Sequence, residues 1–273
     1  MARRRRGRRR GGAGLGGALG LAFGLVGASV LLLAMIGVFV WRQYGEPEID
    51  PVSFCPRDGA SALTVIAIDA TDPYDAVQVR EIDHRVRELL GLLERGHRLD
   101  IYTMNAGRGE LATRTFSKCN PGHATRLHQV AGQPSEVERI YREEFAEAIE
   151  AALSVTIEQG AANRSPIVES VRAIAADSLG DVGQDVPRAL ILVSDLVQHS
   201  DVYSMFRSGV GAFEDFSRTA NYADAQTDLR GAEVEVIVIA RAEYSAYQTR
   251  ALLLWWEEYI RENGGQLRDY SRI

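Results

Sequence analysis

The apolar residues of this chain form one long uninterrupted block and then recur in short runs. Residues 14–40 contain no charged side chain, and Arg10 and Arg42 flank the block. About 20 apolar residues span a bilayer as a helix, whereas the apolar region of a cleavable signal peptide has only about 7–15 residues. The pattern therefore predicts an uncleaved transmembrane helix over residues 13–41.

The charges beside this block predict its orientation. The formal net charge is −6, yet residues 3–10 hold seven arginines and no acid. The positive-inside rule places such a cluster in the cytoplasm. Residues 1–12 are thus expected to form a cytoplasmic tail, and everything beyond the span to lie outside the cytoplasm. Topology and contact with acidic lipid account for the arginines, so no nucleic-acid partner is expected.

Glycines recur at every fourth position of the predicted span. Gly16, Gly20 and Gly24 form consecutive small-xxx-small steps, which allow two membrane helices to pack closely. Glycine is also frequent in spans that do not associate. Self-association through this face is one interpretation, and ordinary span composition is the other.

A proline-rich stretch follows the span and contains the first of two cysteines. Residues 42–59, "RQYGEPEIDPVSFCPRDG", show no period and are predicted to form a short extended linker. Cys55 lies in this stretch and Cys119 lies in "FSKCNPGH". Outside the cytoplasm two cysteines are more often paired than free. A disulfide between them is expected, and two unpaired buried thiols are the alternative.

The remainder of the chain, residues 60–273, alternates between strand and helix patterns. Apolar runs predict strands at 62–68, 98–104, 109–116, 188–195 and 233–240, with an edge strand at 266–271. Helical spacing marks segments that begin at Asp72 and Pro73, at Glu136, at Ser165 and Pro166, and near Ser245. Such alternation predicts an α/β domain with a mostly parallel open sheet and helices on both faces.

Two of the predicted strands end in an aspartate, Asp69 and Asp195. In open parallel sheets ligands bind beyond the carboxyl ends of the strands, where the strand order reverses. Thr71 follows the first aspartate closely, and Ser165 stands at the start of a helix. Two carboxylates and two hydroxyls are hard oxygen ligands. The four residues therefore predict a divalent-cation site, with Mg²⁺ favoured and Ca²⁺ or Mn²⁺ possible.

The order and spacing of these residues resemble the von Willebrand factor A family over roughly residues 60–265. The family's metal-ion-dependent adhesion site has an Asp-x-Ser-x-Ser signature, a threonine from a later helix start and an aspartate after another strand. The matching positions here are Asp69 and Thr71 in "DATDP", Ser165 in "RSPIVES" and Asp195 in "VSDL". The resemblance implies a protein-interaction module in which a partner's acidic side chain completes the metal coordination.

The chain departs from that signature at Pro73, which removes one hydroxyl ligand. Other roles for the same residues are also open. Asp72 and Ser165 both suit a helix N-cap, and Asp69 and Asp195 would also serve as acceptors for backbone amides. A domain that keeps the fold without the metal is therefore the main alternative, for example as a structural subunit of a membrane complex.

Signals for catalysis are few. The five histidines show no metal-ligand spacing, no HExxH or GxSxG motif occurs, and the single lysine, Lys118, lies outside any glycine loop. A binding module rather than an enzyme is expected. Metal-assisted hydrolysis of phosphoesters around Asp69 and Asp195 is the alternative activity.

Aromatic residues and methionine gather in residues 199–216, just after the second strand-end aspartate. Such residues are enriched in protein interfaces. The predicted partner-binding residues are Tyr203, Met205, Phe206 and Phe213. The same side chains would equally form a small core of their own within a long loop.

Overall fold

The computed structural model describes residues 15–44, 48–105, 110–123, 134–157 and 162–273. These residues form two compact units, which divide between Pro47 and Glu48. The basic tail predicted at residues 1–12 lies outside the described residues.

The first unit contains helix α1, Leu15–Tyr44, where the sequence predicts a membrane span. Exposure is described for Gly24 and residues 26–39, and all of these residues are exposed. Within the described part of the chain, no helix is found with both the length and the apolarity needed to cross a bilayer. The membrane anchor and its self-association through Gly16, Gly20 and Gly24 stay predictions.

The second unit is built on a six-stranded sheet in the order β3-β2-β1-β4-β5-β6. The strands are β1 Ala62–Asp69, β2 His97–Met104, β3 Ala112–Cys119, β4 Arg188–Ser194, β5 Glu233–Val238 and β6 Gln266–Arg272. Only β3 runs antiparallel to its neighbour; the other pairings are parallel. This mixed α/β sheet agrees with the predicted fold class, and its order is that of a doubly wound sheet.

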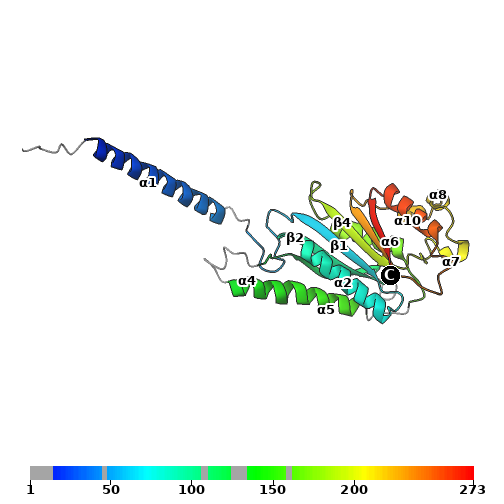
Figure 1. The fold of residues 1–273 in the computed structure, drawn as a ribbon. Coiled ribbons are helices and arrows are strands. Elements are labelled where there is room, and N and C mark those ends of the chain that lie inside the picture. Colours follow the sequence, from blue (N-terminus) through cyan, green and yellow to red (C-terminus); the bar gives the residue numbers. More distant parts are fainter. Residues whose placement is uncertain (1–14, 45–47, 106–109, 124–133, 158–161) are drawn as a thin grey trace, which may run out of the picture. The chain divides into compact units, whose positions relative to one another are not determined.

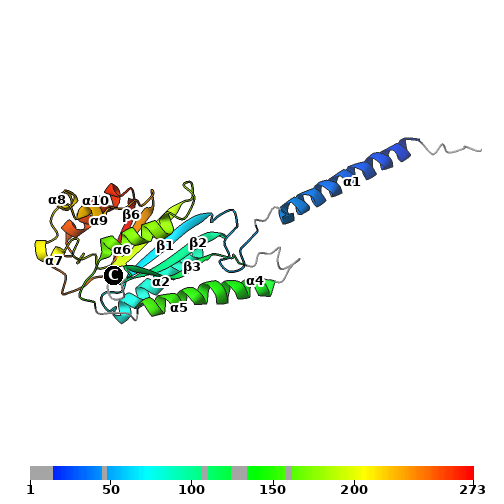
Figure 2. The same ribbon diagram turned by 180° about the vertical axis from the view of Figure 1, so that it is seen from behind.

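Helices cover both faces of this sheet (Figures 1 and 2). The helical elements on one side are α2 Ala76–Leu92, α4 Pro134–Ile140, a π-helical segment Tyr141–Ala146 and α5 Glu147–Ile157. Those on the other side are α6 Ile167–Ile174, a π-helical segment Ala175–Leu179, α7 Met205–Ser208, α8 Phe213–Ser217, α9 Tyr222–Ala225 and α10 Arg250–Glu262. Successive side chains along a strand point to opposite faces of the sheet, so the strands contribute residues to two separate cores.

The central strand β1 shows why the sheet forms where the sequence predicts it. Every residue from Leu63 to Asp69 is buried, as expected of a parallel strand with helices on both sides. Its apolar run pairs in parallel with β2 on one side and β4 on the other. The carboxyl ends of β1 and β4 thus lie side by side, at the point where the strand order reverses.

The start of α2 differs from the prediction that Asp72 caps it. The N-cap is Asp75, whose Oδ1 accepts hydrogen bonds from the amides of Val77 and Gln78. Gln78 Oε1 in turn accepts from the Asp75 amide and completes a capping box. The sequence contains this Asp-x-x-Gln pattern, and the helix begins there instead of at the Asp-Pro pair three residues earlier. Asp72 is therefore not needed by the helix.

The predicted linker is partly folded into the domain. Glu48 and the residues after it belong to the second compact unit, and Cys119 donates its amide hydrogen to the carbonyl of Ser53. A disulfide joins Cys55 to Cys119, and this prediction is confirmed. The bond and the amide contact fasten residues from Glu48 onward to β3, so the extended part of the linker is shorter than 42–59.

Candidate functional site

The carboxylate of Asp69 lies at the carboxyl end of β1 and is surrounded by hydroxyl groups. Its Oδ1 accepts from the amide of Thr71 at 3.1 Å and from the Thr71 hydroxyl at 2.6 Å. Its Oδ2 accepts from the hydroxyls of Ser165 at 3.2 Å and Ser194 at 2.7 Å. Two predicted site residues, Thr71 and Ser165, are therefore in direct contact with a third.

Ser194 is a site residue that the sequence analysis missed. It is the last residue of β4, fully buried, and its hydroxyl also accepts a hydrogen bond from the amide of Leu196. Pro73 lacks the hydroxyl that the family signature has at that position, yet three hydroxyls still surround Asp69. The sequence did contain a signal for Ser194, since it directly precedes Asp195 at the end of a predicted strand. The ends of adjacent parallel strands lie side by side, so a serine at this position can contact Asp69.

Asp195 follows β4 and is also buried, with 4% of its surface exposed. Its Oδ1 accepts from the amide of Val197 at 2.8 Å, and among the described residues this is the one hydrogen bond that its carboxylate receives. The pKa of Asp195 is raised well above its usual value, mainly by burial and in addition by the negative charge of Asp69. Burial also raises the pKa of Asp69, although the hydrogen bonds from Thr71 and Ser194 oppose this effect.

A pocket of about 410 Å³ opens above these strand ends. Thr71, Ser165 and Asp195 line it, whereas Asp69 does not. Asp69 therefore lies behind Thr71 and Ser165 and holds their hydroxyls, while these two residues and Asp195 border the open space. A hydroxyl that donates its hydrogen keeps its lone pairs for another contact.

Asp72, which is free of helix capping, is a second carboxylate in the lining of this pocket. Its Oδ2 accepts a hydrogen bond of 3.3 Å from the Tyr244 hydroxyl, and its carbonyl accepts one of 3.4 Å from Arg241. Arg241 also donates to the carbonyl of Pro73. Burial, together with the charge of Asp72, raises the pKa of Tyr244 to about 12. The loop after β5 thus holds the loop after β1 in place.

Ser165 is not used as a helix cap either. Helix α6 has Pro166 at its N-cap position, and no side chain of that residue or of Ser165 caps it. Gln198 instead accepts a hydrogen bond from the amide of Val168 at 3.0 Å. The Ser165 hydroxyl is therefore left for Asp69, which removes the alternative that this serine serves only the helix.

The predicted partner-binding residues divide between the core and the pocket. Met205 and Phe213 are buried in the core under α10, where no partner can reach them, so these two predictions are corrected. Tyr203 is half-buried and stacks on Trp255. Phe206 is 38% exposed and lines the pocket, with its ring 5.5 Å from that of Tyr244. Met205 and Phe213 are buried because the glycine-rich loop that carries their short helices folds back onto α10.

The residues around the pocket fit a hard divalent cation by their chemistry. Thr71, Ser165 and Asp195 border one space, and the oxygen donors that they carry suit Mg²⁺, Ca²⁺ or Mn²⁺. A cation there would also offset the repulsion between Asp69 and Asp195. In the described part of the chain no cluster of three or more His, Cys, Asp or Glu side chains is found that would hold a metal by itself. Hydroxyl oxygens would therefore have to supply part of the coordination.

Comparison with known proteins gives a likeness of fold. No protein-family model matches the sequence, and the comparison with curated proteins found no match. Two solved structures of proximal thread matrix protein 1 from the mussel byssus are similar, with 13% and 11% identity and TM-scores of 0.37 and 0.40. They cover 67% and 78% of this chain but only 39% and 42% of the mussel protein, so the chain spans about two fifths of its length. Likeness at this level concerns the general fold alone.

Proposed function

We propose that this chain is an interaction module that binds a partner protein at the carboxyl edge of its sheet with the help of a divalent cation. The observation that carries the proposal is the position of Thr71 and Ser165. Both hydroxyls donate to Asp69 and both line the pocket that Asp195 also lines. The resemblance to von Willebrand factor A domains implies the same four residues, although it counts Asp69 among the ligands.

Each residue has a distinct part in this proposal. Thr71, Ser165 and Asp195 would hold the cation, and Asp69 would hold the two hydroxyls in position from behind. The bound cation would supply a positive charge at the floor of the pocket for an acidic group of the partner. Phe206 and Tyr244 stand at the same pocket and would contact the apolar surroundings of that group.

The proposal extends to the location of the module. The uncharged block that precedes the domain and the arginines before that block favour a single membrane span with the domain outside the cytoplasm. The disulfide between Cys55 and Cys119 supports this location, because disulfides persist in oxidising compartments.

Titration calorimetry of the full chain with Mg²⁺, Ca²⁺ and Mn²⁺ tests the cation directly, together with thermal unfolding in EDTA and in each ion. Wild type is expected to bind one ion and to gain about 2.7 kcal/mol at a hundredfold excess over the dissociation constant. Asp195→Asn and Ser165→Ala should lose most of this gain.

Asp83→Asn is the matched control, because Asp83 lies on the surface of α2 and pairs only with Arg87 there. It should bind the ion as wild type does. If wild type shows neither binding nor stabilisation with any of the three ions, the cation-dependent mechanism is wrong, and the fold has kept its strand-end carboxylates without a metal.

A further inference from the structure

The sheet face on which α2 lies is incompletely covered. The helices that follow β4 and β5 pack on the opposite face, where Met205, Phe213 and Trp255 join the other core. In a parallel sheet both faces are normally covered by helices. On the α2 side, however, Ile191 of β4 and Glu235 of β5 are only half-buried. Apolar strand surface is therefore accessible beside α2.

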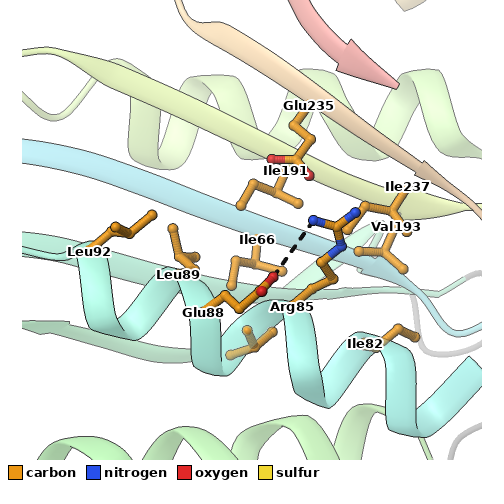
Figure 3. Close-up of a pocket in the computed structure, with 11 residues that line it drawn as sticks. Ile66, Ile82, Arg85, Glu88, Leu89, Leu92, Ile191, Val193, Glu235 and Ile237 are labelled. Carbon is orange, nitrogen blue, oxygen red and sulfur yellow. Dashed lines mark ion pairs between the residues drawn. The ribbon is translucent and has the colours of Figure 1, made fainter. Parts of the chain in front are cut away.

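A groove of about 140 Å³ runs between α2 and this part of the sheet (Figure 3). Leu89 and Leu92 line it from the helix, and Ile191 and Ile237 line it from the strands. Leu92, the last residue of α2, is 78% exposed and adds to this apolar surface. The volume is close to that of a cavity of about 150 Å³ that holds benzene, so one large apolar side chain would fit.

The groove also contains a carboxylate that is held by no ion pair or hydrogen bond among the described residues. Among the described residues, Glu235 receives no hydrogen bond and forms no ion pair. Arg85 reaches toward it in Figure 3 but forms its ion pairs with Glu81 and Glu88 of its own helix. Burial and the nearby charge of Asp269, which is paired with Glu235 in the sheet, raise the pKa of Glu235, and the charge of Arg85 offsets this only in part. A positively charged group placed here would stabilise the partly buried carboxylate and offset its repulsion from Asp269.

We propose that this groove docks an amphipathic helix of a partner protein. The helix inserts one large apolar side chain between Leu89, Leu92 and Ile191 and places an arginine or lysine against Glu235. A second copy of this chain is a poorer occupant. Glu235 and Asp269 of one copy would lie against the same negatively charged residues of the other. The surface is separate from the pocket at the carboxyl edge and does not depend on the cation.

The test uses two synthetic amphipathic helical peptides with the same leucine stripe, which differ at one position beside that stripe, arginine in one and glutamate in the other. They are titrated into the full chain labelled at its isoleucine methyl groups and followed by NMR. The arginine peptide should shift the signals of Ile191 and Ile237 and leave Ile174, in the opposite core, unchanged. It should bind about tenfold more tightly than the glutamate peptide, since hydrogen bonds to charged groups contribute at least that much.

Two variants on the same strand separate this mechanism from general hydrophobic binding. Glu235→Gln should remove the preference for the arginine peptide. Glu233→Gln should keep it, because Glu233 is exposed and pairs with Arg268. Equal binding of both peptides, or shifts centred on Ile174, would overturn the proposal. A concentration-dependent dimer in sedimentation that Ile191→Asp abolishes would overturn it in favour of a second copy.

Discussion

The hydroxyl of Ser194 donates a hydrogen bond of 2.7 Å to Oδ2 of Asp69, across 125 residues of sequence. Ser194 ends β4 and Asp69 ends β1, and the two strands are parallel neighbours. The same hydroxyl accepts from the amide of Leu196, which is itself fully buried. Ser194 thus connects the carboxylate at the reversal of strand order to the loop that carries Asp195.

We predict that Ser194→Ala destabilises the domain. The substitution leaves a buried amide without its acceptor and removes one of the donors to a buried carboxylate, which costs about 1–3 kcal/mol. Urea denaturation followed by circular dichroism measures this change in the free energy of unfolding. Ser154→Ala is the control, because Ser154 is exposed on α5 and bonds only to a carbonyl of its own helix. Equal stability of the two variants would contradict the role of Ser194.

Loss of the disulfide should also destabilise the domain. The bond between Cys55 and Cys119 closes a loop of 64 residues, and in the chain-entropy model such a closure contributes about 4 kcal/mol. The double variant Cys55→Ser, Cys119→Ser should therefore unfold at a lower urea concentration than oxidised wild type. Wild type treated with a reductant is the control and should match the variant. A variant as stable as the oxidised protein would show that the loop is already ordered without the bond.

The two aspartates before α2 should respond differently to substitution. Asp75→Ala removes the side chain that caps the helix, so the amides of Val77 and Gln78 should exchange with solvent about fivefold faster. Asp72→Ala should leave these rates unchanged, because Asp72 bonds to Tyr244 and Arg241 instead. Hydrogen exchange measured by NMR distinguishes the two. Faster exchange in the Asp72 variant would restore the sequence-based interpretation.

The contribution of His97 to stability should fall as the pH is lowered. Burial lowers the pKa of this histidine, and its Nε2 lies 2.8 Å from the Thr64 hydroxyl. The folded protein therefore binds a proton less readily than the unfolded chain. The contribution of His97 to stability is present above a pH of about 6.5 and is lost as the pH falls through the lower pKa of the folded state.

The check is the free energy of unfolding at pH 7.5 and at pH 5. The free energy of unfolding at pH 5 minus that at pH 7.5 should be more positive in His97→Gln than in wild type, because glutamine does not titrate. His84→Gln is the matched control, since His84 is exposed on the surface of α2. An equal change of this difference in both variants would assign the effect to surface charge instead of burial.

The sequence by itself determined the alternation of strands and helices, the end of a strand at Asp69 and the position of Asp195 directly after another strand. These features depend on local periodicity, because a run such as residues 62–68 has the same apolar pattern wherever the strand lies in the sheet. The pairing of Cys55 with Cys119 was predictable for a similar reason, since the chain has no other cysteine.

The tertiary structure decided which polar residue serves which neighbour. Asp72 and Asp75 both suit an N-cap by type, and only the backbone path after β1 selects Asp75 and leaves Asp72 at the pocket. Ser194 reaches Asp69 only because β1 and β4 are adjacent. Met205 and Phe213 are core residues only because their loop folds onto α10. Each of these outcomes is a contact between distant parts of the chain, and a local pattern carries no information about which distant residues the fold brings together.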